Sequence, residues 1–419
     1  MSDSTSVDAP RRTLNLLQTA AILIFGLATL LYTMQLFTPL RLTTDGIRYL
    51  SLADSGIRGH GLSTIAAKYF FFPKGYPVFL FGMMKLGIFS SAVLVASNLV
   101  FLWLALVLSF QTLTANGFQR EVAAVACLFT YLSYAAIKHV TQAMSDFLFF
   151  SLAAGAFWLI NRKGPYRWLA VLPALGAVEV RLLGLALFVP IAFVVWQSAA
   201  KRPKLLIAVC AVLVCCLGVG LWAGRRYFSA NSSLLRQYGV GHFLWYSGVT
   251  HCEDFGQLVF NVPWTKLPGW TAVLIIGTGV IAIIFLMIGV IALFKSSPMI
   301  SLYLVGCSVL IFPWPYTDPR FWLPVMPYVV VAIWIAVVRI FEKVPDWTLV
   351  GYTALFSIAG FAALGYSTWI TFSGPQFPYR YGDGLLRSAY IAHCSGSPAG
   401  NQDAIDLLRR YEWHCVSKE

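Results

Sequence analysis

Charged residues are scarce in this sequence. Only 11% of its 419 residues are Asp, Glu, Lys or Arg, whereas 58% are hydrophobic. The mean hydropathy is +0.73, and a typical soluble domain has roughly 25% charged residues. So few charges are not enough to cover the surface of a soluble protein of this size. We therefore expect lipid to be the main solvent of the chain.

The sequence also lacks short alternating strands and the common motifs for binding nucleotides or zinc. Its apolar runs are about 20 residues long, the length of a helix that crosses a bilayer, whereas the strands of a membrane barrel would alternate in polarity. No Walker, Rossmann, HExxH or paired CxxC pattern is present, so nucleotide-driven and zinc chemistry have no support. The predicted fold class is an all-α polytopic membrane protein.

Acidic residues are fewer than basic ones, 17 against 30, which gives a net charge of +13. In membrane proteins, basic residues gather in cytoplasmic loops and beside lipid headgroups. The excess therefore indicates membrane lipids as partners and not nucleic acid. The first apolar run, Leu14–Phe37, is too long for a cleavable signal peptide and is followed by further runs. Most of the eight cysteines lie in apolar runs, but Cys394 and Cys415 lie in the polar tail and are candidates for a disulfide if that tail faces an oxidising compartment.

The apolar runs predict about eleven transmembrane helices. Their ranges are 14–37, 89–113, 119–138, 143–161, 166–180, 182–198, 204–223, 270–294, 298–313, 321–339 and 347–371. We divide the run 166–198 in two because Glu179 and Arg181 lie at its centre, where a charge facing lipid would cost several kcal/mol. Residues 1–371 then form a transmembrane domain, and residues 372–419 form a small extracytoplasmic segment.

The short basic loops predict the orientation of the chain. By the positive-inside rule they lie in the cytoplasm, which assigns six other segments to the extracytoplasmic side. These are the first outer loop 38–88, the turns 139–146 and 179–181, the loop 224–268, the turn 313–320 and the tail 372–419. The first outer loop is itself basic, contrary to a strict charge count, and a functional need for positive charge there would account for this.

The first outer loop is predicted to contain two helices at the membrane surface. The residues that follow Asp45 have the apolar spacing of an amphipathic helix with Arg48 on its polar side, and glycines 56, 59 and 61 end it. The stretch Pro73–Pro77 predicts a sharp turn, after which a second interfacial helix is expected.

The order of these features resembles an established family. A long first span, then Asp-x-x-x-Tyr-Leu-x-Leu-Ala from Asp45, then Pro-Lys-Gly-Tyr-Pro from Pro73, is similar to the first outer loop of the GT-C superfamily of membrane glycosyltransferases. The protein O-mannosyltransferases and the lipid A aminoarabinose transferases are the nearest in style. The stretches TQAMSDFLFFSLAAGAF from Thr141, EVRLLGLALFVP from Glu179 and DPRFWLPVMPYVVVA from Asp318 resemble later parts of the same family.

The resemblance implies an inverting transfer of a sugar from a polyprenyl-phosphate donor to an extracytoplasmic acceptor, which would be a glycan, a lipid or a protein. The implied location is a bacterial inner membrane. The family departs from this chain in two places: Asp45 is followed by Gly46 where the family often has Glu, and Lys74 is followed by Gly75 where the aminoarabinose transferases have Pro.

Candidate site residues follow from this chemistry. Asp45 is the candidate general base, because a hydroxyl is a poor nucleophile until its proton is accepted. Asp146 is a second acid that would orient the acceptor or help to hold a divalent cation; the metal stays open because some members of the superfamily use one and others do not, and no other cofactor is indicated. The candidates for binding the donor phosphate are cations, which stabilise a leaving phosphate in a low-dielectric site: Lys74, Arg181 and Arg320. The candidates for binding the acceptor are aromatic: Tyr49, Trp245 and Tyr246.

Each candidate also has a structural interpretation. Asp45 fits a helix N-cap, Lys74 a lysine that snorkels to the interface, and the loop aromatics an interfacial belt. The remaining alternatives are local ion pairs: Asp146 with Lys138, Arg181 with Glu179, and Arg320 with Asp318.

Two other functions compete with the glycosyltransferase. One is an O-antigen-type polymerase or ligase that takes a lipid-diphosphate glycan, and the other is a flippase or transporter of lipid-linked sugars. A transporter needs charges in a cavity reached from both sides, whereas the charges in this sequence are predicted to gather at one face.

Overall fold

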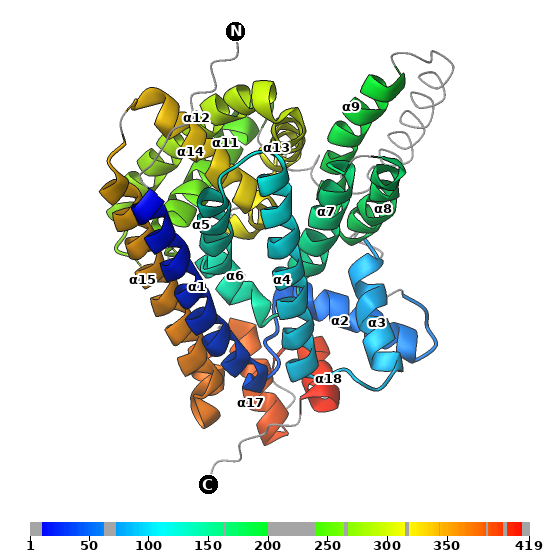
Figure 1. Cartoon of the computed structure of the whole chain (residues 1–419). Helices are drawn as coiled ribbons and strands as arrows, with labels where there is room; N and C mark the ends of the chain where they lie inside the picture. Colours follow the sequence, from blue (N-terminus) through cyan, green and yellow to red (C-terminus); the bar gives the residue numbers. More distant parts are fainter. Residues whose placement is uncertain are drawn as a thin grey trace.

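The computed structural model describes residues 11–62, 73–162, 164–199, 236, 239–263, 267–314, 318–342, 344–382, 384–396 and 400–412. These residues are almost entirely helical, and an isolated parallel bridge joins Arg41 to Gln142. Figure 1 shows the helices as a bundle with the N-terminus at one end and the C-terminus at the other.

Four helical segments among the described residues are long and apolar enough to cross a membrane. They are α4 (Ser91–Ala115), α12 (Thr271–Ser296), the segment Pro319–Ile340 that ends in α14 (Met326–Ile340), and α15 (Asp346–Thr371). A fifth span results if α5 (Arg120–Tyr131) and α6 (Tyr134–Val140), which are bent by 52° at a short break, act as one. The protein is thus all-α with several helices of membrane-spanning character.

The prediction of eleven spans is not confirmed. Several of the expected spans are helices of 10 to 15 residues, which reach about 15–23 Å at 1.5 Å per residue and fall short of a hydrocarbon core of about 30 Å. These shorter helices are α7 (Asp146–Ile160), α8 (Val171–Val180), α9 (Phe188–Ala199) and α13 (Pro298–Ile311). In α1 (Arg11–Met34), the described apolar portion begins at Ile22, and the expected span 204–223 lies outside the described residues.

The expected polar loop 224–268 contains a long helix, α11 (Val240–Phe260), which is absent from the membrane-crossing set above. It packs closely on α12 because two glycines leave room for backbone contact. A Cβ on Gly279 of α12 would lie 1.7 Å from the carbonyl oxygen of Cys252, and one on Gly256 of α11 would lie 2.0 Å from that of Ile275. Small residues of this kind let helices approach closely, so α11 belongs to the bundle and is not a free loop.

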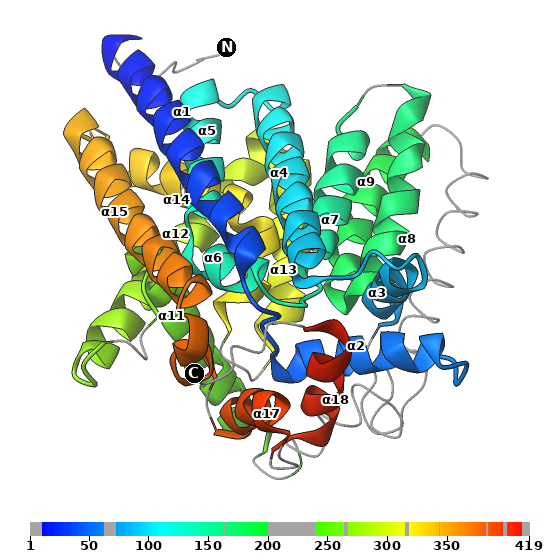
Figure 2. The ribbon, with the colours of Figure 1, turned by 90° about the horizontal axis from the view of Figure 1, so that it is seen from below.

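Helices α2 (Thr44–Ile57) and α3 (Gly75–Lys85) occupy the two places where the first outer loop was predicted to be helical. Thr43 caps α2, because its Oγ1 accepts from the backbone N–H of Gly46 at 2.9 Å. The helix ends at Arg58, and Gly59 follows with φ of +81°, a conformation that favours glycine. Figures 1 and 2 show α2 and α3 at the same end of the bundle as α17 (Gly384–Ser395) and α18 (Gln402–Tyr411).

The C-terminal helices are fastened to the first outer loop by four residues, which we call the C-terminal clasp: Tyr390, Arg410, Tyr411 and Glu412. The hydroxyl of Tyr390 donates to the carbonyl oxygen of Leu40 at 2.6 Å, and Glu412 accepts from the backbone N–H of the same residue. Asp54 of α2 accepts from Arg410 at 2.6 Å and from Tyr411 at 2.9 Å. The clasp therefore holds the helix that carries Asp45.

Replacing Asp54 by Ala should loosen the clasp and reduce the free energy of unfolding by about 1–3 kcal/mol, because Arg410 and Tyr411 lose a buried hydrogen-bond partner. Limited proteolysis should then release the tail after residue 372 faster than in the unsubstituted protein. Asp403→Ala on the exposed side of α18 is the matched control and should leave the cleavage rate unchanged.

The clasp should also weaken in acid. Burial raises the pKa of Asp54, but hydrogen bonds from Tyr411, Arg58 and Arg410 outweigh it and leave the pKa below the ordinary value. A carboxyl with a lowered pKa contributes stability above its ordinary pKa of about 3.9 and loses it as the pH falls through the folded value. Cleavage of the tail should therefore accelerate below about pH 4, and Asp54→Ala should lack this acceleration; an equal acceleration in both proteins would contradict the role of Asp54.

Candidate functional site

Charged side chains from separate segments meet at the end of the bundle where α2 lies. They come from the first turn of α2, the end of α6, the start of α7, the turn after α8, and the 3-10 turn η6 (Pro319–Phe321) with the residue before it. We call the group the charged cluster; its members are Asp45, His139, Asp146, Arg181, Asp318 and Arg320. These segments all begin or end helices, because a charged residue interrupts the apolar pattern there.

Arg320 joins two carboxylates. Its Nη2 lies 2.9 Å from Asp45 Oδ2, and its Nε lies 2.7 Å from Asp318 Oδ2. Asp318 also accepts from the backbone N–H of Arg320 at 3.1 Å, which forms the cap of η6. Arg48, one turn along α2, lies 3.7 Å from the other oxygen of Asp45. The side chain of Asp45 is 27% exposed. It is therefore accessible, although two cations hold it in place.

Asp146 and Arg181 form a second ion pair. Asp146 is completely buried, and its Oδ1 accepts from Arg181 Nη1. Its other oxygen, Oδ2, has no hydrogen-bond partner within the described part of the chain. Asp146 lies in the first turn of α7, where the helix dipole favours a negative charge.

The two ion pairs are adjacent. The ring of Phe321 contacts both guanidinium groups, with its centroid 5.2 Å from Cζ of Arg181 and 5.4 Å from Cζ of Arg320. Cations over aromatic faces are stabilised by the ring quadrupole. Phe321 thus contacts both cations of the cluster.

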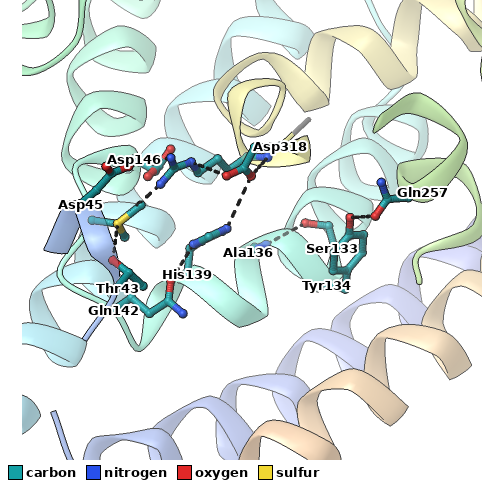
Figure 3. Close-up of polar contacts among 12 residues, drawn as sticks. Thr43, Asp45, Ser133, Tyr134, Ala136, His139, Gln142, Asp146, Gln257 and Asp318 are labelled. Carbon is teal, nitrogen blue, oxygen red and sulfur yellow. Dashed lines mark hydrogen bonds and ion pairs between the residues drawn. The ribbon is translucent and has the colours of Figure 1, made fainter. Parts of the chain in front are cut away.

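His139 completes the cluster. Its Nδ1 lies 2.8 Å from Gln142 Oε1, and its Nε2 lies 3.8 Å from Asp318 Oδ1. The amide of Gln142 is oriented by Tyr381, to which its Nε2 donates at 3.4 Å while the tyrosine hydroxyl donates to the carbonyl oxygen of Leu42 at 2.7 Å. This network assigns the proton to Nδ1 in the neutral imidazole. Figure 3 shows His139 directed toward Asp318, with Asp45 and Asp146 to the left of these two residues.

The sequence did not single out His139 as a site residue, and it indicated Asp318 only as a local partner of Arg320. Both lie in turns that were assigned to the same side of the membrane as Asp45. The signal that would have identified both residues is this shared side together with their position in the chain. Each lies in the same predicted turn as a predicted site residue, His139 with Asp146 and Asp318 with Arg320.

The structural alternatives are partly wrong. The N-cap of α2 is Thr43, so Asp45 is not the cap. Arg181 pairs with Asp146 and not with Glu179, whose side chain is exposed. The pairing of Arg320 with Asp318 is confirmed, and the same guanidinium also reaches Asp45.

Tyr49 lies beside the cluster, and its ring packs edge-on against Tyr76 with centroids 5.2 Å apart. Its hydroxyl is 3.5 Å from Ser145 Oγ. Burial raises the pKa of Tyr49, an effect that nearby Arg181 and the hydrogen bond to Ser145 partly oppose. The group is therefore a neutral hydroxyl at physiological pH.

The other predicted site residues are not brought to the cluster by any described contact. Lys74 is exposed one residue before α3, and Gly75 packs on the backbone of Glu179, where a Cβ would lie 2.7 Å from the carbonyl oxygen. The residue after Lys74 thus packs against the turn that contains Arg181. Lys74 itself makes no ion pair with any described residue. Trp245 and Tyr246 are 73% and 55% exposed on α11.

Among the described residues, no group of three or more His, Cys, Asp or Glu side chains is arranged to hold a metal ion. Of the disulfide candidates, Cys394 is exposed in α17, and Cys415 lies outside the described residues. No protein-family model and no curated protein matches the chain.

Proposed function

We propose that the protein is a membrane glycosyltransferase that moves a sugar from a polyprenyl-phosphate donor to a hydroxyl acceptor. The contact between Asp45 and Arg320, which are 275 residues apart, is the observation that carries the proposal. It brings a partly exposed carboxylate against a cation, and a second cation, Arg181, contacts the same aromatic ring as Arg320. An acid to accept a proton and cations to receive a phosphate are what this reaction requires.

In the proposed reaction, a carboxylate oxygen of Asp45 accepts the proton of the acceptor hydroxyl. The hydroxyl oxygen forms a bond to the anomeric carbon as the bond from that carbon to the phosphate oxygen breaks. The electron pair of the broken bond leaves with the polyprenyl phosphate. Attack from the side opposite the leaving group inverts the anomeric centre.

Arg320 would bind the departing phosphate. A guanidinium has five N–H donors in a planar fork, so Arg320 is able to contact a phosphate while it holds Asp318. Its pairing with Asp45 orients the base before the acceptor arrives. Arg181 would add a second cation against the ring of Phe321, and Lys74 a third at the headgroup.

Asp146 would act on the acceptor. Its Oδ2 is buried without a described partner, and an unsatisfied buried acceptor favours a bound hydroxyl. Tyr49, which stays protonated, would donate a hydrogen bond to the sugar. Trp245 and Tyr246 lie on the exposed side of α11. They would contact a part of the acceptor that lies away from the cluster.

In the proposed location the cluster lies on the extracytoplasmic face, as the basic loops predict, of a bacterial inner membrane, which the resemblance to the GT-C superfamily implies. The acceptor would then be a lipid, a polysaccharide or a protein of the cell envelope. The lipid tail of the donor would lie in the bilayer beside the bundle, with its phosphate at headgroup depth.

The test uses the purified full chain in liposomes with radiolabelled undecaprenyl-phosphate sugars and a membrane extract as the source of acceptor. We expect label to move from the donor lipid to a new product, and Asp45→Asn to abolish this transfer because the amide accepts no proton. Ser51→Ala, a partly buried position of the same helix, is the control and should retain transfer.

Three outcomes would contradict the proposal. Full transfer by Asp45→Asn would remove the assigned base. Transfer only from an undecaprenyl-diphosphate glycan would indicate a polymerase or ligase. Label that crosses the bilayer without any glycosyl product would indicate a flippase.

A further inference from the structure

A second buried acid–imidazole pair lies on α11, outside the charged cluster. His251 and Asp254 are both completely buried, and His251 Nδ1 lies 3.1 Å from Asp254 Oδ2. The other ring nitrogen, Nε2, lies 2.9 Å from the backbone carbonyl oxygen of Trp314. Ser247, one turn earlier on α11, donates to the same carbonyl at 3.0 Å.

The contacts of His251 determine where its proton lies. A carbonyl oxygen only accepts hydrogen bonds, so Nε2 must carry a hydrogen and donate it to Trp314. Nδ1 then faces the carboxyl of Asp254 and needs a second proton between the two atoms. Without that proton, a nitrogen lone pair would face a carboxylate oxygen at hydrogen-bond distance, which is repulsive.

The surroundings of the pair make its shared proton sensitive to pH near neutrality. Burial raises the pKa of Asp254 to about 7, although the hydrogen bond and charge of His251 oppose the increase. The carboxylate of Asp318 acts in the same direction as burial, and the Asp318 backbone in the opposite direction. Loss of the proton would place a negative charge in the interior next to Asp318.

The pair contacts the segment that carries part of the charged cluster. Trp314 lies four residues before Asp318, which holds Arg320 at 2.7 Å. Trp322, two residues after Arg320, packs on the same helix, with its ring centroid 4.5 Å from Phe255 and 6.1 Å from His251. Movement of α11 relative to this segment would displace both Asp318 and Arg320.

We infer that His251 and Asp254 are positioning residues that share one proton and use it to hold Trp314, Asp318 and Arg320 in place. With the proton present, His251 donates to Trp314 and is itself fixed by Asp254. With the proton absent, the pair repels and the segment is released from α11. The cluster is then assembled at neutral and acidic pH and loosened at alkaline pH.

Titratable groups from two other elements lie near the pair: Asp318 from the turn before η6 and Tyr134 from α6. Glu253, on α11 itself, interacts with Tyr134. Helix α12, which packs on α11, has no charged residue before Lys295, and α15 has none after Asp346. The carboxyl that contacts His251 Nδ1 is that of Asp254, so substitution of Asp254 isolates the shared proton.

The test compares Asp254→Asn, Asp254→Ala and the unsubstituted full chain in detergent. The amide N–H₂ of Asn donates to Nδ1 as the protonated carboxyl does, but it does not titrate.

Hydrogen–deuterium exchange of the peptide covering residues 312–322 is measured from acidic to alkaline pH, relative to a peptide from α4 that corrects for intrinsic exchange. We expect exchange in the unsubstituted protein to rise by about tenfold on passing to alkaline pH, the factor that one buried hydrogen bond typically supplies. Asp254→Asn should remain protected throughout, and Asp254→Ala should exchange fast at every pH.

Thermal unfolding provides a second readout. Because the pKa of Asp254 is raised in the folded protein, its protonated form contributes stability that is present in acid and is lost as the pH rises through about 7. The unfolding temperature of the unsubstituted protein should therefore fall relative to that of Asp254→Asn as the pH rises to about 7, and the difference should be constant above it. Glu253→Gln removes a neighbouring charge on the same helix and should follow the unsubstituted protein.

Several results would overturn the inference: a pH response of Asp254→Asn equal to that of the unsubstituted protein, equal protection in the Asn and Ala variants, or failure of Asp254→Asn to fold. None of these measurements uses a sugar donor. The inference therefore stands or falls separately from the proposed glycosyl transfer.

Discussion

Replacing Arg320 by Lys should reduce kcat for glycosyl transfer by about 10²–10³-fold, with a much smaller change in KM. Removal of one preorganised group that stabilises developing charge typically has an effect of this size. Lysine keeps the charge but is a single point donor, whereas Arg320 contacts Asp45 and Asp318 at once through different nitrogen atoms. The measurement is the steady-state rate of transfer from a radiolabelled polyprenyl-phosphate sugar.

Arg48→Lys is the matched control for this prediction. Arg48 also faces Asp45, but at 3.7 Å and with its side chain 31% exposed, so an exposed pair of this kind contributes roughly 0–1 kcal/mol. We expect Arg48→Lys to transfer at close to the original rate. Equal losses for the two variants, or an unchanged kcat for Arg320→Lys, would show that Arg320 does not stabilise the leaving phosphate.

Replacing Asp146 by Ala should reduce the free energy of unfolding by about 3–5 kcal/mol, the cost of leaving a largely buried cation without its partner. Asp146 is completely buried, and Arg181 is only 14% exposed in its side chain. Chemical or thermal unfolding of the purified protein in detergent measures the loss. Glu179→Ala removes an exposed acid two residues from Arg181 and should change stability by less than about 0.5 kcal/mol.

A double substitution separates the structural and chemical roles of this pair. Asp146→Leu with Arg181→Met removes both charges and fills a similar volume, so much of the lost stability should return. Glycosyl transfer should stay low in the double variant, because it lacks the carboxylate and one of the cations. Recovery of both stability and transfer would assign the pair a purely structural role.

The turns that supply the charged cluster were predictable because charges interrupt apolar runs at Asp146, at Glu179–Arg181 and at Asp318–Arg320. The helix break near Arg181 was predicted from the cost of a charge in lipid, and the structure has α8 end at Val180. The number of spans was not predictable in this way. An apolar run of 15 residues looks the same whether it crosses a bilayer or packs inside a bundle, and α7 and α13 are of this kind.

Helix α11 shows a different limit. Its sequence contains His251, Glu253 and Asp254, which made the region look like a polar loop. In the structure His251 contacts the segment that begins at Phe312, and it is buried together with Asp254 as a pair. Burial of such a pair depends on a partner 63 residues away, the carbonyl of Trp314, and no local pattern reveals it.

The amino-acid sequence alone determined that this protein is helical and lipid-associated and that charges interrupt its apolar runs, because apolar length and the cost of a charge in hydrocarbon are local properties. Tertiary structure alone decided which charges become partners: Arg181 with Asp146 instead of Glu179, Arg320 with both Asp45 and Asp318, and Asp54 with the C-terminal clasp. Ion pairs and hydrogen bonds need atoms within about 3–4 Å, and only the packing of distant helices brings these residues to that distance.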